Sequence, residues 1–128
     1  MREYFYYIDF NGKLFHDQTE LTDKKFLDFF FKRIIKNNTG LHSDFPYISP
    51  CGNEMNFVKS YDTPFVFQDL KENYLFYSPS LFMQFQPDRL TYSESGVVYH
   101  PLNDVSKGRL HTKLLIEFSP FIRFESGK

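Results

Sequence analysis

Apolar and polar side chains at the start of the chain suggest a β-strand followed by a tight turn. Tyr4 to Ile8 is an unbroken aromatic and β-branched run, and Asn11-Gly12 is the dipeptide most typical of a two-residue type I′ turn. Lys13 to Phe15 then returns as the second strand. The pattern predicts an opening β-hairpin with positive φ at both turn residues. Aromatic side chains fall on both faces of the first strand, so we expect both faces to be covered.

After Thr22, apolar residues recur with the 3.6-residue period of an α-helix. We predict a helix over residues 24–36, with Thr22 as its N-cap and Asn37-Asn38 at its end. Phe29 is the one large apolar side chain on the basic face of this helix, and we expect a partner or another segment of the chain to cover it. The predicted core stripe of the helix is Leu27, Phe30, Phe31 and Ile34, flanked by Phe26 and Ile35.

Short apolar runs separated by turn residues fill the rest of the chain. They predict strands at 56–59 and 65–68 joined as a hairpin by Asp62-Thr63-Pro64, a further hairpin from 74–77 and 81–85, and strands at 97–99, 110–118 and 121–124. Together with the helix, these strands predict an α+β fold. We expect a single domain over residues 1–128, with a curved, mainly antiparallel sheet built from hairpins and one main helix packed on it.

Composition narrows the classes of function. Fifteen Lys and Arg against sixteen Asp and Glu give a net charge of −1, which argues against a nucleic-acid partner. Phe and Tyr make up 20% of the residues, which predicts an aromatic-rich core or, alternatively, an aromatic contact surface. We find no signal peptide and no apolar run long enough to span a membrane. A single cysteine cannot form an intramolecular disulfide, so we expect a cytoplasmic protein without a membrane anchor.

Four motifs in the same order connect the sequence to a known family. These motifs are Arg2 to Asp9, Phe45 to Phe57 around Ser49-Pro50-Cys51-Gly52, Asp62 to Phe67, and Tyr99-His100-Pro101. The sequence resembles the eukaryotic uncharacterised protein family 0598, which implies no assigned activity. Animal members carry a mitochondrial-type leader and a further C-terminal segment, and this sequence shows neither. The resemblance therefore implies a mitochondrial location only as an alternative.

The rigid turn around Pro50 holds the strongest candidate for chemistry. Cys51 is a possible nucleophile with His100 as its base, and Glu54, Asp62 or Glu117 could orient the imidazole. The alternative is a structural thiol buried beneath the turn, because unpaired cysteines are commonly buried. The four histidines lack the spacing of a local metal site, and no glycine-rich phosphate loop is present. We therefore expect no metal and no cofactor.

Two classes of function remain. The first is an interaction or assembly module that contacts a protein partner or a second copy of itself, because aromatic side chains are abundant and catalytic residues do not converge in the sequence. The second is a thiol-dependent or otherwise cryptic small-molecule enzyme that uses Cys51 with His100. The two classes differ in whether Cys51 and His100 share a pocket open to solvent.

Overall fold

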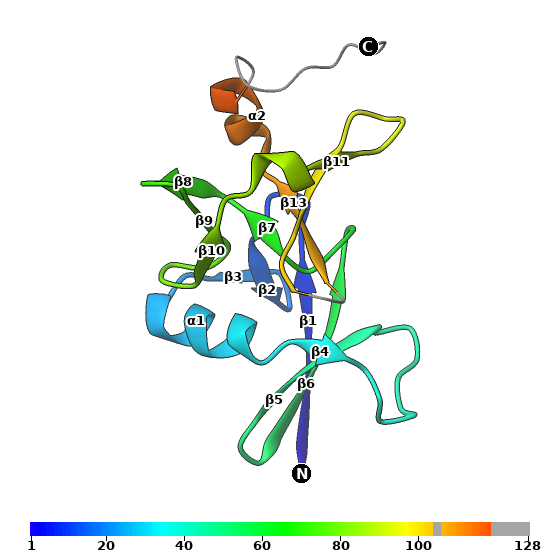
Figure 1. Cartoon of the computed structure of the whole chain (residues 1–128). Helices are drawn as coiled ribbons and strands as arrows, with labels where there is room; N and C mark the ends of the chain where they lie inside the picture. Colours follow the sequence, from blue (N-terminus) through cyan, green and yellow to red (C-terminus); the bar gives the residue numbers. More distant parts are fainter. Residues whose placement is uncertain (104–105, 119–128) are drawn as a thin grey trace.

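The first sixty residues build one large mixed sheet. The computed structural model describes residues 1–103 and 106–118. In the first half (Figure 1), the sheet order is β3-β2-β1-β6-β5-β4, and the two central strands, β1 and β6, are parallel. The elements of this half are β1 (Arg2–Ile8), β2 (Leu14–His16), β3 (Thr19–Leu21), α1 (Lys24–Lys32), β4 (Ile35–Lys36), β5 (Tyr47–Cys51) and β6 (Glu54–Ser60).

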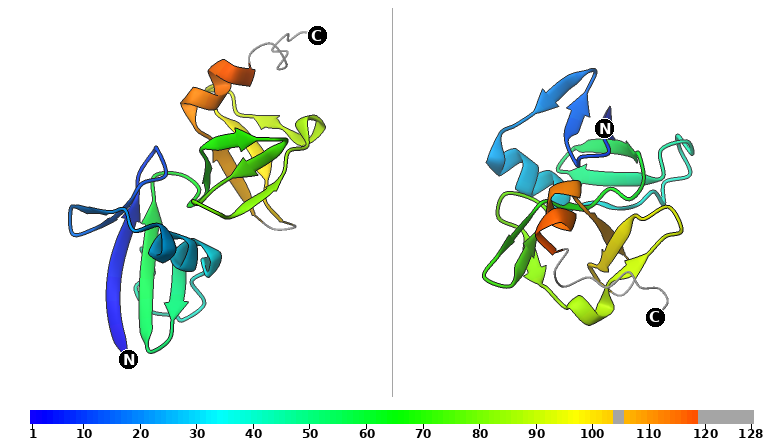
Figure 2. Two further views of the ribbon diagram at one scale, coloured as in Figure 1. Left: turned by 90° about the vertical axis from the view of Figure 1, so that its left-hand side faces the viewer. Right: turned by 90° about the horizontal axis from the view of Figure 1, so that it is seen from above.

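The remaining residues form two smaller sheets. One has the order β10-β9-β8 and the other β11-β12-β13-β7, in which β13 and β7 are parallel. Figure 2 shows this second half beside the first, with α2 at its far end. Its elements are β7 (Val66–Phe67), β8 (Asp69–Lys71), β9 (Tyr74–Phe76), β10 (Phe82–Gln84), a 3₁₀ turn (Pro87–Arg89), β11 (Thr91–Tyr92), β12 (Val98–Pro101), β13 (Lys107–Leu110) and α2 (Thr112–Phe118).

Each half has its own main hydrophobic cluster, and Phe65 at the start of the second half belongs to the first cluster. Tyr77 and Leu102 pack against both clusters and so connect the halves. Full burial of a large apolar side chain in either cluster contributes about 1.5–3 kcal/mol before entropy is counted. The α+β prediction is confirmed, and the strands are distributed over three sheets. The first cluster contains Tyr6, Ile8, Leu14, Phe30, Phe31, Ile34, Val58 and Phe65, and the second contains Phe67, Leu75, Val98, Leu110, Leu114 and Phe118.

Helix α1 begins at Lys24 as predicted, but its N-cap differs from the predicted one and it ends four residues earlier. Its N-cap is Asp23 rather than Thr22, because the Asp23 carboxylate accepts the Phe26 N–H at 2.8 Å. The helix ends at Lys32, and Ile35–Lys36 pairs with β5 as β4. Strand pairing gives these two residues the backbone partners that a frayed last turn would lack. Of the predicted stripe, Phe30, Phe31 and Ile34 are buried, whereas Ile35 is exposed.

The opening hairpin is confirmed, but the predicted type I′ turn is wrong. Of its two turn residues only Gly12 has a positive φ, at 83°, and its N–H donates to the Asp9 carbonyl at 3.0 Å. The Asp9 side chain also accepts the N–H groups of Asn11 and Lys13, both at 2.9 Å. This carboxylate stabilises a longer loop, in which a turn is followed by a glycine bulge.

Two turns without glycine have the dihedral angles that we expected at Asn11-Gly12. Asp17 and Gln18, between β2 and β3, have φ values of 53° and 73°. Glu72 and Asn73, between β8 and β9, have φ values of 50° and 74°. Positive φ at both central residues of a two-residue hairpin loop is the signature of a type I′ turn. The twist of the flanking strands therefore outweighs the steric cost at these side chains.

Two predictions for the second half are wrong. Strand β6 pairs with β1 and β5 rather than with residues 65–68, and β7 joins the other half by pairing with β13. The predicted strand 110–118 ends at Leu110 and continues as helix α2, which places Leu110, Leu114 and Phe118 four residues apart in the core. The hairpin of β9 and β10 and the strand near residue 98 are confirmed. Residues 121–124 lie outside the described part.

Three contacts fix the seam between the halves. The Asp28 carboxylate on α1 accepts the Ser78 hydroxyl at 2.8 Å and the Ser80 N–H at 3.0 Å. The Arg109 guanidinium lies 3.9 Å from the centroid of the Phe10 ring, which belongs to the β1–β2 loop. Cation–π contacts of this kind contribute up to about 2 kcal/mol when they are shielded from water. The loop of the first half is thus held against the second.

Candidate functional site

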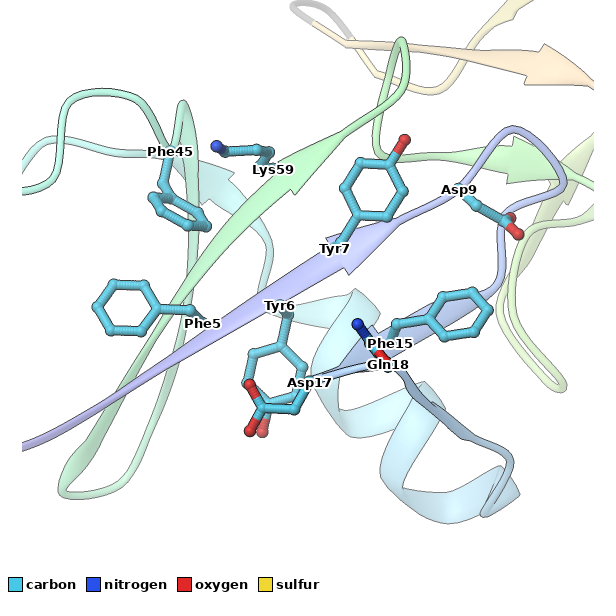
Figure 3. A pocket seen from close by; sticks show the side chains of 9 residues that line it. All are labelled: Phe5, Tyr6, Tyr7, Asp9, Phe15, Asp17, Gln18, Phe45 and Lys59. Atoms are coloured by element: carbon cyan, nitrogen blue, oxygen red, sulfur yellow. The ribbon is translucent and has the colours of Figure 1, made fainter.

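The two faces of the six-stranded sheet differ in what covers them. On β1, Tyr6 and Ile8 belong to the core beneath α1. Successive side chains of a strand alternate between faces, so Phe5 and Tyr7 point to the opposite face. Cross-strand pairing places Phe15 of β2 beside Tyr7, and Phe45 lies beside Phe5 with 5.1 Å between ring centroids. We call these four rings, Phe5, Tyr7, Phe15 and Phe45, the aromatic face (Figure 3).

The aromatic face borders an open cavity of about 540 Å³. This volume is within the usual range of sites that bind small molecules or peptide side chains. Phe5 is 38% exposed and Tyr7 is 41% exposed, although both belong to the central part of the sheet. The cavity is lined by Phe5, Tyr6, Tyr7, Asp9, Phe15, Asp17, Gln18, Phe45 and Lys59.

Beneath Phe5, the aromatic face rests on packed rings. Phe5 stacks on Phe57 of β6 with 5.6 Å between ring centroids, and His42 packs edge-on against Phe57 at 4.5 Å. Phe57 is fully buried as a result. Among the described residues, side chains cover this face of the sheet over Phe57 of β6. They do not cover Phe5 and Tyr7 of β1. Phe5, which faces solvent, is therefore held in place by the rings of Phe57 and Phe45.

Charged groups lie at the margins of the cavity. Lys59, the one cation among the described residues that line it, is 3.5 Å from the Asp44 carboxylate and 4.5 Å from the centroid of the Phe45 ring, so it already has an anionic and an aromatic partner. Asp17 extends from the β2–β3 turn and is 88% exposed at its side chain, with His16 at 3.7 Å. Asp9 contributes a second carboxylate. The margin is therefore acidic, while the centre is aromatic.

Cys51 and Glu54 lie together at one end of the sheet. They are cross-strand partners in the β5–β6 hairpin. The Cys51 thiol is partly exposed and 3.7 Å from the Ser49 hydroxyl, and Glu54 pairs with Arg2 at 3.5 Å. Neither residue lines the cavity beside the aromatic face.

His100 lies in the other half, on β12, and is fully buried. Its Nε2 accepts the Gln86 N–H at 2.9 Å and its Nδ1 donates to the Pro101 carbonyl at 2.8 Å, so both ring nitrogens are occupied. Burial, assisted by the charge of Arg89, lowers the pKa of His100 and favours the neutral imidazole. The structure thus places Cys51 and His100 in different sheets with different hydrogen-bond partners.

The other two acids considered as orienting groups, Asp62 and Glu117, lie elsewhere. The Asp62 carboxylate accepts the Tyr99 hydroxyl at 2.6 Å, a hydrogen bond that, with burial, raises the pKa of Tyr99 to about 12. Glu117 is exposed on α2. Among residues 1–103 and 106–118, no three His, Cys, Asp or Glu side chains are grouped as metal ligands. The helices in this part of the chain are too short or too polar to cross a membrane.

Phe29 is half exposed on α1. The Arg33 guanidinium lies 3.6 Å from the centroid of its ring and covers one side of it. This local contact stabilises an exposed ring without a second chain. That a partner covers Phe29 stays a prediction.

The sequence contained one signal for the aromatic face that we interpreted differently. Phe5 and Tyr7 alternate with Tyr4, Tyr6 and Ile8 along the first strand, and aromatic side chains on both faces predict that both faces are covered. Only one long helix is encoded in the first half, and one helix can cover only one face of a sheet. Counting the helices that could cover the sheet would have identified the face that stays open.

The fold and the site together define an α+β protein with two packed halves and an aromatic sheet face that no helix of residues 1–103 and 106–118 covers. The chain belongs to the family described as domain of unknown function DUF4505, which matches residues 1–128. This result supports the expected uncharacterised family in general terms.

Two solved structures are similar in fold. One is a DUF1285 family protein from Shewanella baltica OS155, with a TM-score of 0.67 and 17% identity over 93% of both chains. The other is a DUF1285 family protein from Silicibacter pomeroyi DSS-3, with a TM-score of 0.62 and 12% identity over 94% of this chain and 70% of that chain. At these identities the similarity concerns the fold alone.

Proposed function

We propose that the protein is an interaction module that binds a partner protein through the aromatic face. One observation carries the proposal: Phe5, Tyr7, Phe15 and Phe45 from three separate segments line one open cavity on the sheet face opposite α1. Interfaces favour aromatic anchors at their centre and charged residues at their rim, which is the arrangement of this cavity.

Rigidity supports the same function. Binding costs less conformational entropy when the contacting side chains are already fixed. Phe5 is held by Phe57 and Phe45, and Tyr7 lies between its cross-strand neighbours Phe15 and Lys59. A second group of exposed rings, Tyr74 and Phe82 on β9 and β10, does not line this cavity. It provides a matched control.

The test is selection of binders from a random-peptide display library on the immobilised protein. Peptides enriched on the parent protein are then measured against Tyr7→Ser and Phe82→Ser, both of which change an exposed ring. We expect Tyr7→Ser to weaken binding by about tenfold or more, as for a central interface residue, and Phe82→Ser to leave it unchanged. Thermal melts check that both variants remain folded. Equal affinity for the parent and Tyr7→Ser, or no enrichment at all, would contradict the proposal.

A further inference from the structure

Strand β1 has an open edge beside the aromatic face. It pairs with β6 along its whole length, from Arg2 to Ile8, but with β2 only at Tyr7 and Ile8. Among the described residues, no strand lies next to residues 2–6 on the β2 side, because β2 turns away into β3 at Asp17-Gln18. In the left view of Figure 2, the lower part of β1 forms the outer edge of the sheet.

The backbone groups at this edge can be assigned from hydrogen bonds at the two ends of the strand. The Arg2 N–H donates to the Asn53 carbonyl at 3.2 Å, on the β6 side, and the Asp9 N–H donates to the Lys13 carbonyl at 3.0 Å, on the β2 side. Backbone groups of alternate residues point to the same side of a strand, so those of Glu3 and Phe5 also point to the β2 side. In the described part of the chain, no strand pairs with them on that side. They are a template for an additional strand.

The open edge and the aromatic cavity adjoin each other. Phe5 belongs to both, and the Asp17-Gln18 turn that ends β2 also lines the cavity. A strand added along residues 2–6 would therefore place alternate side chains over Phe5, Tyr7 and Phe15. Recognition of extended peptides commonly combines backbone pairing at a sheet edge with pockets for alternate side chains.

Charge identifies the kind of peptide. The carboxylates of Asp9 and Asp17 border the cavity, whereas Lys59, the one cation among its described lining residues, is already paired with Asp44. Glu3, at the open edge, adds a third carboxylate and is paired with His42 at 2.9 Å. A second copy docked edge to edge would bring further carboxylates to this margin. A basic peptide gains favourable contacts there instead.

We propose that the partner is an extended peptide segment with alternating basic residues and one central aromatic residue, which adds to β1 as a further strand of the sheet. This inference rests on the proposed function, because it names the partner of the same aromatic face. The backbone of the peptide pairs with Glu3 and Phe5, its aromatic side chain contacts Phe5 and Phe15, and its basic side chains lie near Asp9 and Asp17.

Proline at position 3 tests the backbone contact. Glu3→Pro removes the N–H that points to the open edge and leaves the groups that pair with β6, and proline is tolerated at such edge positions. Glu3→Ala is the matched control, since it removes the same carboxylate and keeps the N–H. The probe is a short fluorescent peptide in which threonine alternates with lysine around a single central phenylalanine. We expect Glu3→Pro to weaken its binding by about tenfold relative to Glu3→Ala, through one lost hydrogen bond and the bulk of the ring.

Amide hydrogen exchange provides a second measurement on the unmodified protein. In the free protein the Glu3 and Phe5 amides should exchange quickly, while Tyr4 and Tyr6, which point to β6, are protected. Addition of the peptide should protect Glu3 and Phe5. If these two amides are already protected in the free protein, and more so at higher concentration, a second copy occupies the edge and the peptide proposal is wrong.

The outcomes separate this inference from the proposed function. Binding that is lost in Tyr7→Ser but equal in Glu3→Pro and Glu3→Ala would overturn strand addition and retain the aromatic face as the binding site. No binding of the peptide up to about millimolar concentration, while library peptides still depend on Tyr7, would also overturn strand addition. If library peptides bind Tyr7→Ser as tightly as the parent, both strand addition and the proposed function are wrong.

Discussion

The two halves of the molecule cover their sheets to different degrees, although the second half also has exposed rings, Tyr74 and Phe82, on β9 and β10. In the second half, Phe67 and Phe118 are buried between small sheets and α2, and Phe85 stacks on Phe118 with 4.9 Å between centroids. In the first half, α1 covers one face of a six-stranded sheet, and on the other face Phe5 and Tyr7 stay near 40% exposed. Small sheets can close around a core, whereas a broad sheet needs a cover on each face.

This difference suggests a division of roles. Enclosed rings stabilise the fold, because removing them leaves a cavity and a loss of apolar contact. Exposed rings on a rigid sheet contribute less to stability and are available for a partner. The seam between the halves, where Arg109 meets Phe10, holds the open face at a fixed position relative to the closed half.

The largest expected effect compares one ring from each half. Phe67→Ala removes a fully buried ring and should lower the free energy of unfolding by about 3–5 kcal/mol. Tyr7→Ala should lower it by less than about 1 kcal/mol, since the side chain is 41% exposed. Urea denaturation of the two variants measures both values. Losses of similar size would show that the aromatic face belongs to the folding core and would break the comparison.

A smaller effect tests the seam. Gly12 has a φ of 83°, and a Cβ at this position would lie 2.7 Å from the Val66 Cβ of β7. Gly12→Ala should therefore cost about 2 kcal/mol or more, from the positive φ and from the steric overlap together. Gly40 has a φ of 78°, and a Cβ there would meet no described atom within 4 Å, so Gly40→Ala should cost only about 1 kcal/mol. Thermal melts that give equal losses would show that the two halves do not pack closely at Gly12.

Local patterns predicted the elements that depend on neighbours in sequence. The β1–β2 hairpin, the β9–β10 hairpin and the buried stripe at Phe30 and Phe31 were all legible from periodicity and turn residues. The type of the first turn was not, because the Asp9 side chain decides it through two hydrogen bonds to nearby N–H groups. A dipeptide pattern predicts the type of a turn correctly only when no nearby side chain forms hydrogen bonds with the backbone N–H groups of that turn.

Long-range pairings were beyond the reach of the same reasoning. The parallel pair of β1 and β6 joins segments far apart in the sequence, for example Phe5 with Phe57, and no local signal encodes it. The helix α2 was missed because its apolar residues suit either a buried strand or a helix over so short a run. The aromatic face depends on two facts: β6 lies beside β1, and in the described part of the chain no second helix covers that side.

The smallest expected effect is a pH dependence that arises in the closed half. Burial lowers the pKa of His100 in the folded protein, while in the unfolded chain it returns to about 6.5. Between these two pKa values the unfolded state holds more protons, so the free energy of unfolding falls as the pH falls below about 6.5. The slope from this one group is at most about 1.4 kcal/mol per pH unit. The parent protein should therefore lose stability more steeply between about pH 7 and 5 than His100→Gln, which retains an amide for hydrogen bonding but does not titrate. NMR titration of the His100 ring would confirm a midpoint below the ordinary value, and parallel stability curves for the two proteins would show that this imidazole is not buried as the structure describes.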